Sequence, residues 1–194
     1  MVIDRLRNAD NMAVACVYCD FHAQNEQSAT ALLGTLLKQV VSALEQIPEE
    51  VQRAFGKSKG RLGDRRPLLP DILEMLAESL ACLERAFICI DALDEFPADH
   101  RSELWESLQK IVHMRPNVRL FLTGGFQIRS EVKKYFPRTV KQLQISPSKH
   151  EIGLYMRMRL RDLKHNAMDK ELEADMLRII PEVSSGTYVF SQYV

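Results

Sequence analysis

The chain has 194 residues, and its 26 Lys and Arg are balanced by 26 Asp and Glu, so its formal net charge is zero. A hydrophobic share of 46% and a charged share of 27% exclude a disordered or a collagen-like chain. Zero net charge gives no electrostatic argument for a nucleic-acid partner or a polybasic membrane anchor, and no run approaches the ~18 apolar residues of a membrane span. We therefore expect neither nucleic acid nor membrane among the partners.

Four cysteines, Cys16, Cys19, Cys82 and Cys89, bear on the compartment. The first two form a C-x-x-C, a spacing that redox and zinc sites share. Both stand in an apolar run that is typical of a buried strand, and the other two lack metal-ligand spacing. Buried, reduced cysteines behave as small hydrophobic residues. Because the N-terminal segment also alternates in charge, unlike a signal peptide, we expect a cytoplasmic protein.

Hydrophobic periodicity divides the chain into strands and helices. Continuous or alternating apolar runs predict strands, and apolar residues at spacings of three and four predict helices. Helix starts are marked by Pro70 with Asp71, and by Ser148 with Glu151. In chain order the predicted elements are the end of a helix at 1–9, a strand at 13–21, helices at 28–46 and 49–55, a helix at 70–83, a strand at 86–91, a helix at 100–113, a strand at 118–123, a short helix at 128–135, a strand at 140–145, and helices at 148–163 and 170–180.

The basic segment 56–67, GKSKGRLGDRRP, contains a GKS tripeptide that suggests a phosphate-binding loop. Such a loop needs a glycine further upstream and a buried strand leading into it. The upstream position is Val51, and the residues before Gly56 have a helical pattern. We therefore interpret this segment as a solvated loop.

Strands that alternate with helices predict an α/β fold with a mostly parallel sheet covered on both faces. The two helices after Ser148 have no strand between them, and they predict a separate helical subdomain. We expect a domain boundary between these units, with an α/β domain at 1–147 and the helical subdomain at 148–194.

The segment AFICIDALDEF, residues 86–96, is the most informative of the chain. Its apolar run ends in Asp91, and the acidic pair Asp94 and Glu95 follows. Ligands bind beyond the carboxyl ends of strands in parallel α/β sheets, where one carboxylate can hold Mg²⁺ and another can orient water. Alternatively, these acids only cap the structure that follows the strand.

This segment resembles the magnesium-binding Walker B strand of NACHT-type nucleoside triphosphatases of the STAND class. The likeness is greatest to the nephrocystin-like NACHT modules of large fungal proteins, which ankyrin or other repeats often follow. The segments that carry it are, in order, VACVYCDFHAQNEQSATALLGTLLKQVV, AFICIDALDEF, the sensor-like VRLFLTGG, ISPSKHEIGLYMRMRL and SSGTYVFSQYV.

The resemblance implies a role for each acidic position and two cofactors. Asp91 would coordinate Mg²⁺, Asp94 and Glu95 would activate water, and Thr123 would sense the γ-phosphate of ATP or GTP. It also implies a partial P-loop NTPase sheet, because the Walker A loop, G-x-x-x-x-G-K-[ST], occurs nowhere in the sequence. We therefore expect the Walker A strand to be missing and the edge of the strand at 118–123 to be exposed.

A second departure concerns the sensor segment, where the family carries an arginine and this chain has Gly125. Loss of that charge would weaken phosphate binding, so we expect the chain alone to be catalytically inactive. Two hypotheses remain open. The chain is a fragment or degenerate form of a nucleotide-controlled signalling switch with attached effector or repeat domains, or it is a non-catalytic scaffold that binds protein partners. Self-association is possible in either case.

Overall fold

The computed structural model describes residues 11–22, 27–49, 51–53, 56, 67–137, 140–145, 147–162, 169–183 and 189–193. The helix end expected at 1–9 and most of the basic loop lie outside the described residues. Within them, no helix combines the length and the apolar character that crossing a membrane requires.

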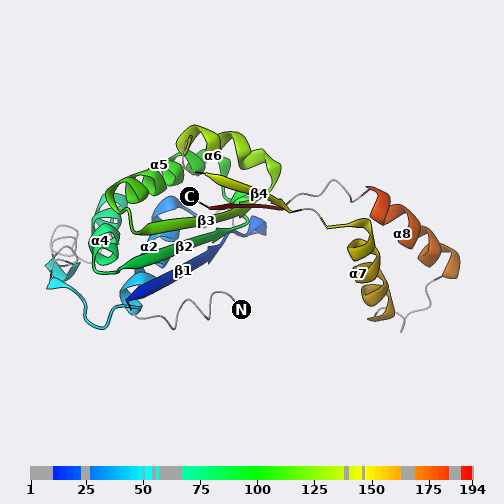
Figure 1. Cartoon of the computed structure of the whole chain (residues 1–194), viewed down its shortest axis with the longest axis horizontal. Helices are drawn as coiled ribbons and strands as arrows, with labels where there is room; N and C mark the ends of the chain where they lie inside the picture. Colours follow the sequence, from blue (N-terminus) through cyan, green and yellow to red (C-terminus); the bar gives the residue numbers. More distant parts are fainter. Residues whose placement is uncertain are drawn as a thin grey trace.

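The described residues form a five-stranded sheet in the order β1-β2-β3-β5-β4 (Figure 1). Its first three strands are parallel, with Cys16 of β1 opposite Cys89 of β2, and Ile88 of β2 opposite Leu120 of β3. The predicted α/β class with a partial parallel sheet is confirmed. The strands are β1 (Met12–Tyr18), β2 (Arg85–Asp91), β3 (Val118–Gly124), β4 (Lys141–Ile145) and β5 (Val189–Tyr193).

The expectation of an exposed edge at β3 is wrong. β5, near the end of the chain, pairs antiparallel with β3 from Phe121 to Gly124, and on its other side it pairs antiparallel with all of β4. An edge strand offers unpaired N–H and C=O groups that another strand can satisfy. Sequence analysis assigned no strand after Ser148, so it missed the segment that covers this edge.

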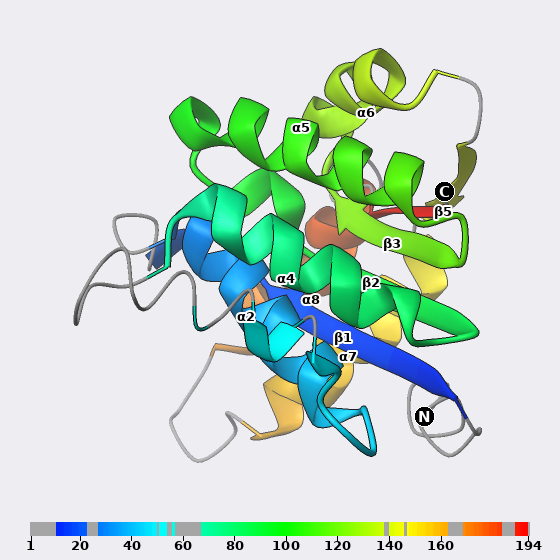
Figure 2. The ribbon, with the colours of Figure 1, turned by 90° about the vertical axis from the view of Figure 1, so that its left-hand side faces the viewer.

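Helices pack against one face of the parallel strands (Figure 2). Alternate residues of β1, β2 and β3 point into one hydrophobic core, for example Ala15, Ile88 and Leu120. On the opposite face Phe87 and Phe121 are half-buried and lie outside this core. We expected helices on both faces of the sheet, and the described helices cover one of them. These are α2 (Ala29–Ser42), α4 (Leu69–Ala81), α5 (Ala98–Met114) and α6 (Arg129–Tyr135).

Local sequence explains how α2 and α4 begin. The hydroxyl of Ser28 accepts a hydrogen bond from the N–H of Ala31 at 3.2 Å, as an N-cap residue does. Before α4, the carboxylate of Asp71 accepts from the N–H of Leu68, also at 3.2 Å. Each bond satisfies a backbone donor that the helix itself leaves free.

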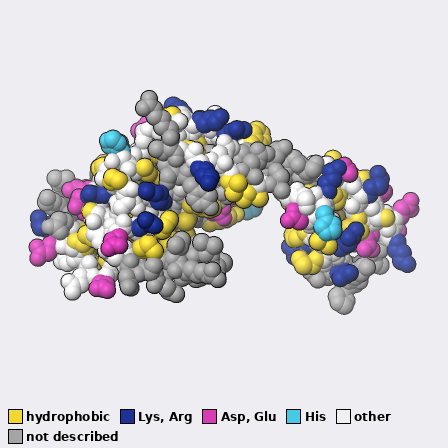
Figure 3. Space-filling view, in the orientation of Figure 1, with side chains coloured by type: hydrophobic (Ala, Val, Ile, Leu, Met, Phe, Trp, Pro, Cys, Tyr) yellow, Lys and Arg dark blue, Asp and Glu magenta, His cyan; other side chains and the backbone are white. Residues whose placement is uncertain are grey.

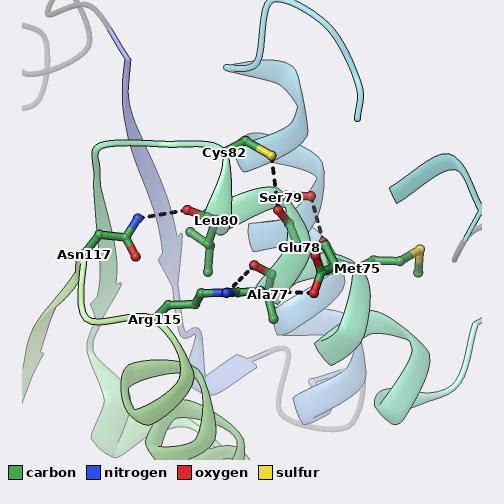
Figure 4. A network of polar contacts seen from close by, with 8 residues as sticks. All are labelled: Met75, Ala77, Glu78, Ser79, Leu80, Cys82, Arg115 and Asn117. Carbon is green, nitrogen blue, oxygen red and sulfur yellow. Dashed lines mark hydrogen bonds and ion pairs between the residues drawn. The ribbon is translucent and has the colours of Figure 1, made fainter. Parts of the chain in front are cut away.

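The carboxyl end of α4 is held by the loop between α5 and β3 (Figure 4). The amide nitrogen of Asn117 donates to the carbonyl oxygens of Leu80 and Leu83, each at 2.8 Å. Nε of Arg115 donates to the carbonyl oxygen of Ala77 at 2.7 Å. A cation and an amide donor therefore add hydrogen bonds to carbonyl groups at and just after the end of α4.

The helices α7 (Lys149–Asp162) and α8 (Lys170–Val183) form a hairpin that stands apart from the sheet (Figure 1). The predicted start of α7 is confirmed. The carboxylate of Glu151 accepts from the N–H of Ser148 at 2.7 Å, and the hydroxyl of Ser148 accepts from the N–H of Glu151 at 3.2 Å. Lys149 and Glu182 join the two helices by an ion pair of 2.5 Å.

Candidate functional site

The carboxyl ends of β2 and β3 bring Asp91 and Thr123 together. Asp91 is the last residue of β2, and Thr123 is next to last in β3. The hydroxyl of Thr123 donates to the carboxylate of Asp91 and accepts from the N–H of Ala92 at 2.9 Å. One hydroxyl thus links the strand-end carboxylate to the first backbone N–H of the turn that follows it.

Ala92 turns the chain away from β2 in a left-handed conformation, with φ 52° and ψ 45°. This region is unfavourable for a residue with a Cβ atom and costs roughly 1–2 kcal/mol. The turn continues into the short 3-10 helix η2 (Leu93–Glu95), where the N–H of Glu95 donates to the carbonyl of Ala92 at 2.9 Å. Strained backbone conformations of this kind are common at functional sites. Here the turn at Ala92 sets the direction in which Asp94 and Glu95 follow β2.

Glu95 connects the acidic turn to the segment after β1. Its carboxylate accepts a hydrogen bond from the N–H of Phe21 at 3.0 Å. A second hydrogen bond joins the same part of the chain to the end of β2: the N–H of Cys19 donates to the carbonyl oxygen of Asp91 at 3.0 Å. The negative charge of Glu95, followed by burial and by the nearby aspartates, raises the pKa of the Tyr18 hydroxyl. The carboxylate of Glu95 therefore acts on the end of β1 and the segment after it, and the Cys19 hydrogen bond joins that segment to the end of β2.

Asp94 lies against the two glycines that follow Thr123. A Cβ atom built on Gly124 would lie 3.1 Å from Oδ1 of Asp94, and one built on Gly125 would lie 2.9 Å from Oδ2. Gly125 has φ −67° and ψ 172°, which any residue can adopt, so space and not backbone conformation favours glycine there. The position where the resemblance implies an arginine therefore faces the carboxylate of Asp94.

A half-buried network of polar contacts, which sequence analysis missed, supports this turn. The guanidinium of Arg101 donates to the carbonyl oxygens of Phe96 at 2.7 Å and Asp94 at 3.3 Å, and it pairs with the carboxylate of Glu131 at 3.0 Å. The indole N–H of Trp105 donates to the other carboxylate oxygen of Glu131 at 2.6 Å. Arg101 closely follows the acidic turn in sequence, which is the only local signal for it, whereas Glu131 lies 30 residues further on.

The negative charges of Asp91, Asp94 and Glu95 act on the same neighbouring side chain, but the three carboxylates do not surround a common point. Burial raises the pKa of the Cys19 thiol to about 12, and the charges of Glu95, Asp91 and Asp94 add to that effect, while Arg101 opposes it. Within the described residues, no group of three or more His, Cys, Asp or Glu side chains is arranged to hold a metal ion. A cation at this edge would therefore be held by at most two of these protein side chains, with its other ligands supplied by water or by a bound molecule.

Comparison with known proteins assigns the chain to a family. The family model of the nephrocystin 3 N-terminal region matches residues 1–124, which is more than half of the chain and includes Asp91, Asp94, Glu95 and Thr123. Comparisons with the curated proteins and with the solved structures gave no match. On the family match and on the α/β fold that carries these residues, the chain belongs to the nephrocystin 3 N-terminal family.

Proposed function

We propose that this chain is part of a nucleotide-controlled signalling switch of the NACHT and STAND type, which regulates an attached effector or repeat domain. The observation that carries the proposal is the link between Asp91 and Thr123, with Ala92 as its third member. Through this link, any ligand that contacts Asp91 also acts on the end of β3 and on the acidic turn. Membership of the nephrocystin 3 N-terminal family supports the proposal.

The donor groups at the strand ends fit a hydrated Mg²⁺ ion. Asp91 is exposed and offers a carboxylate oxygen, the type of ligand that Mg²⁺ prefers, and one or two carboxylates suffice when phosphate and water complete the shell. Bound Mg²⁺ would neutralise phosphate charge of ATP or GTP. Thr123 would orient Asp91, and Asp94 or Glu95 would orient a water molecule.

We also propose that this chain alone does not hydrolyse nucleotide. Its sequence contains no G-x-x-x-x-G-K-[ST] loop, whose backbone N–H groups and lysine would hold the phosphates. Gly125 supplies no positive charge beside Thr123, and the nearby cation Arg101 is paired with Glu131. Binding that depends on Asp91 is therefore the activity to test first.

The test is a thermal unfolding scan with Mg-ATP, Mg-GTP or Mg²⁺ alone, on the parent chain, Asp91→Asn and the matched control Asp175→Asn on α8. A ligand at 100 times its Kd adds about 2.7 kcal/mol to the free energy of unfolding, which raises Tm. We expect a nucleotide-dependent rise in the parent and the control that Asp91→Asn lacks. Each Tm is compared with that of the same variant without ligand.

A different observation favours the scaffold alternative. Glu95 and Asp94 each have a local structural contact, the first with the N–H of Phe21 and the second with the glycines after Thr123. Acids used in this way need no ligand. A cooperative transition whose Tm is the same with and without Mg-nucleotide would overturn the nucleotide proposal and assign the chain to protein partners.

A further inference from the structure

Cys16 of β1 and Cys89 of β2 form a pair that is far apart in the sequence and adjacent in the sheet. Their Cα atoms are partners in the register of these two parallel strands. The residue before each of them, Ala15 and Ile88, belongs to the hydrophobic core. Because successive side chains of a strand point to opposite faces, both thiols lie on the face of the sheet opposite that core.

This pair differs from the C-x-x-C motif, whose second cysteine is Cys19. Cys19 is completely buried in the hydrophobic core, whereas Cys16 is half-buried and lies outside that core. Cys82 is exposed and directly follows α4. On its other side, Cys89 has Phe121 of β3 as its register partner. Of the four cysteines, Cys16 is therefore the one that stands beside Cys89.

The spacing of the two strands brings this pair within reach of a disulfide bond. Neighbouring strands lie about 4.8 Å apart, and disulfides join Cα atoms that are roughly 4.4–6.8 Å apart. Side chains that stand side by side on one face keep their Cβ atoms about as far apart as the strands, slightly beyond the roughly 3.5–4.5 Å of a relaxed disulfide. A bond between Cys16 and Cys89 would therefore be strained, and strained disulfides are more easily reduced.

Both thiols are open to a small molecule, because Cys16 and Cys89 are half-buried and not enclosed. The surface of the α/β domain is of mixed character: Figure 3 shows hydrophobic side chains, the class that includes cysteine, among Lys and Arg. When a small disulfide reacts with one of two neighbouring thiols, the second thiol can displace the small molecule within the same chain. A cysteine without such a neighbour keeps the small molecule instead.

We propose that Cys16 and Cys89 form a reversible disulfide when the chain meets a small disulfide such as oxidised glutathione. One cysteine, as its thiolate, attacks the small disulfide, which forms a mixed disulfide and releases one small thiol. The other cysteine then attacks the protein sulfur of that mixed disulfide and releases the second small thiol. Two electrons pass from the cysteines to the small disulfide, and its two thiol products take up the two protons that the cysteines lose.

The experiment brings the full chain to equilibrium with mixtures of reduced and oxidised glutathione. Acid then stops the exchange, the remaining thiols are alkylated in denaturant, and mass spectrometry identifies the linked tryptic peptides. We expect oxidising mixtures to remove two alkylatable thiols together and to link the peptide of Cys16 to that of Cys89. Excess reduced glutathione should restore both thiols.

Variants identify the linked sulfur atoms, because Cys16 and Cys19 share one tryptic peptide. We expect Cys16→Ser to abolish the link and Cys19→Ala to keep it. The exposed Cys82 provides the matched control, since Cys82→Ser should form the link in the same mixtures as the parent. Circular dichroism shows whether each variant is folded, and fragment ions that separate Cys16 from Cys19 give the same assignment in the parent chain.

Three results would overturn the proposal. Cys16 and Cys89 that stay alkylatable in every mixture, while Cys82 takes up glutathione, would show that small disulfides do not reach the pair. Glutathione retained on either cysteine without a link would show that the two sulfur atoms cannot meet. A link from Cys89 to Cys19, or between two chains, would assign the reactive pair elsewhere.

Discussion

The side-chain amide of Gln39 forms two hydrogen bonds with the main chain of Cys16. The N–H of Cys16 donates to Oε1 at 2.9 Å, and Nε2 donates to the carbonyl oxygen of Cys16 at 2.7 Å. β1 is the outer strand of the described sheet, so these are the groups that a further strand would use. The amide from α2 thus takes the place of a neighbouring strand at the middle of this edge.

We expect Gln39→Leu to lower the free energy of unfolding by about 1–3 kcal/mol, because a half-buried donor and acceptor lose their partners together. Urea denaturation followed by circular dichroism measures this loss. Ser42→Ala removes an exposed hydrogen bond of the same helix, from the Ser42 hydroxyl to the carbonyl of Lys38, and should cost under about 0.5 kcal/mol. Equal stability of the two variants would show that the amide does not protect the edge.

The parallel part of the sheet could be predicted from sequence because its signals are local. Apolar runs define β1, β2 and β3, and the carboxyl ends of parallel strands meet at one edge, which brings Asp91 and Thr123 together. The capping box of Ser148 and Glu151 is also a local pattern, and the structure confirms it.

The features that sequence analysis missed depend on contacts between distant segments. β5 finds its place by pairing with β3, about 70 residues earlier, and nothing in its own residues indicates which edge it covers. The Glu131 carboxylate meets Arg101 only because α6 packs beside α5. Gln39 likewise resembles any other polar residue on a helix in sequence, and its contact with Cys16 exists because α2 packs against β1. Such contacts depend on tertiary packing, which periodicity does not describe.

Asn117→Asp should destabilise the α/β domain by at least about 2 kcal/mol. The substitution keeps the shape of the side chain but removes the donor that serves the carbonyls of Leu80 and Leu83, and it adds a negative charge beside them. The control is Gln109→Glu, which removes one exposed hydrogen bond to the carbonyl of Tyr135. Urea denaturation should show the larger loss for Asn117→Asp; a smaller loss than in the control would contradict the role of Asn117 at the end of α4.

The two glycines after Thr123 should differ in their tolerance of alanine. A Cβ atom on Gly124 would lie 2.6 Å from Cδ1 of the buried Ile128 and 3.3 Å from the backbone nitrogen of Asp94, so we expect Gly124→Ala to cost about 1–3 kcal/mol. On Gly125 the nearest atoms are Oε1 of the exposed Gln127 and Oδ2 of Asp94, the latter at 2.9 Å, and both stand at the ends of side chains that can rotate away. Gly125→Ala should therefore cost less, and thermal unfolding of both variants tests this order.

The thiols of the buried Cys19 and the half-buried Cys89 should make the protein less stable at alkaline pH. Burial raises the pKa of Cys89 to about 12, with Cys16 adding to the effect, and burial together with nearby carboxylates does the same for Cys19. Between the ordinary value of 9.0 and about 12, the unfolded chain loses these thiol protons while the folded chain keeps them. The stabilisation is therefore complete below pH 9, and the free energy of unfolding falls as the pH rises above it.

Urea denaturation at a series of pH values from 8 upward should show a smaller fall for the double variant Cys19→Ala, Cys89→Ala than for the parent. The exposed Cys82 provides the control, since Cys82→Ala should follow the parent. A double variant that also follows the parent would show that neither Cys19 nor Cys89 contributes.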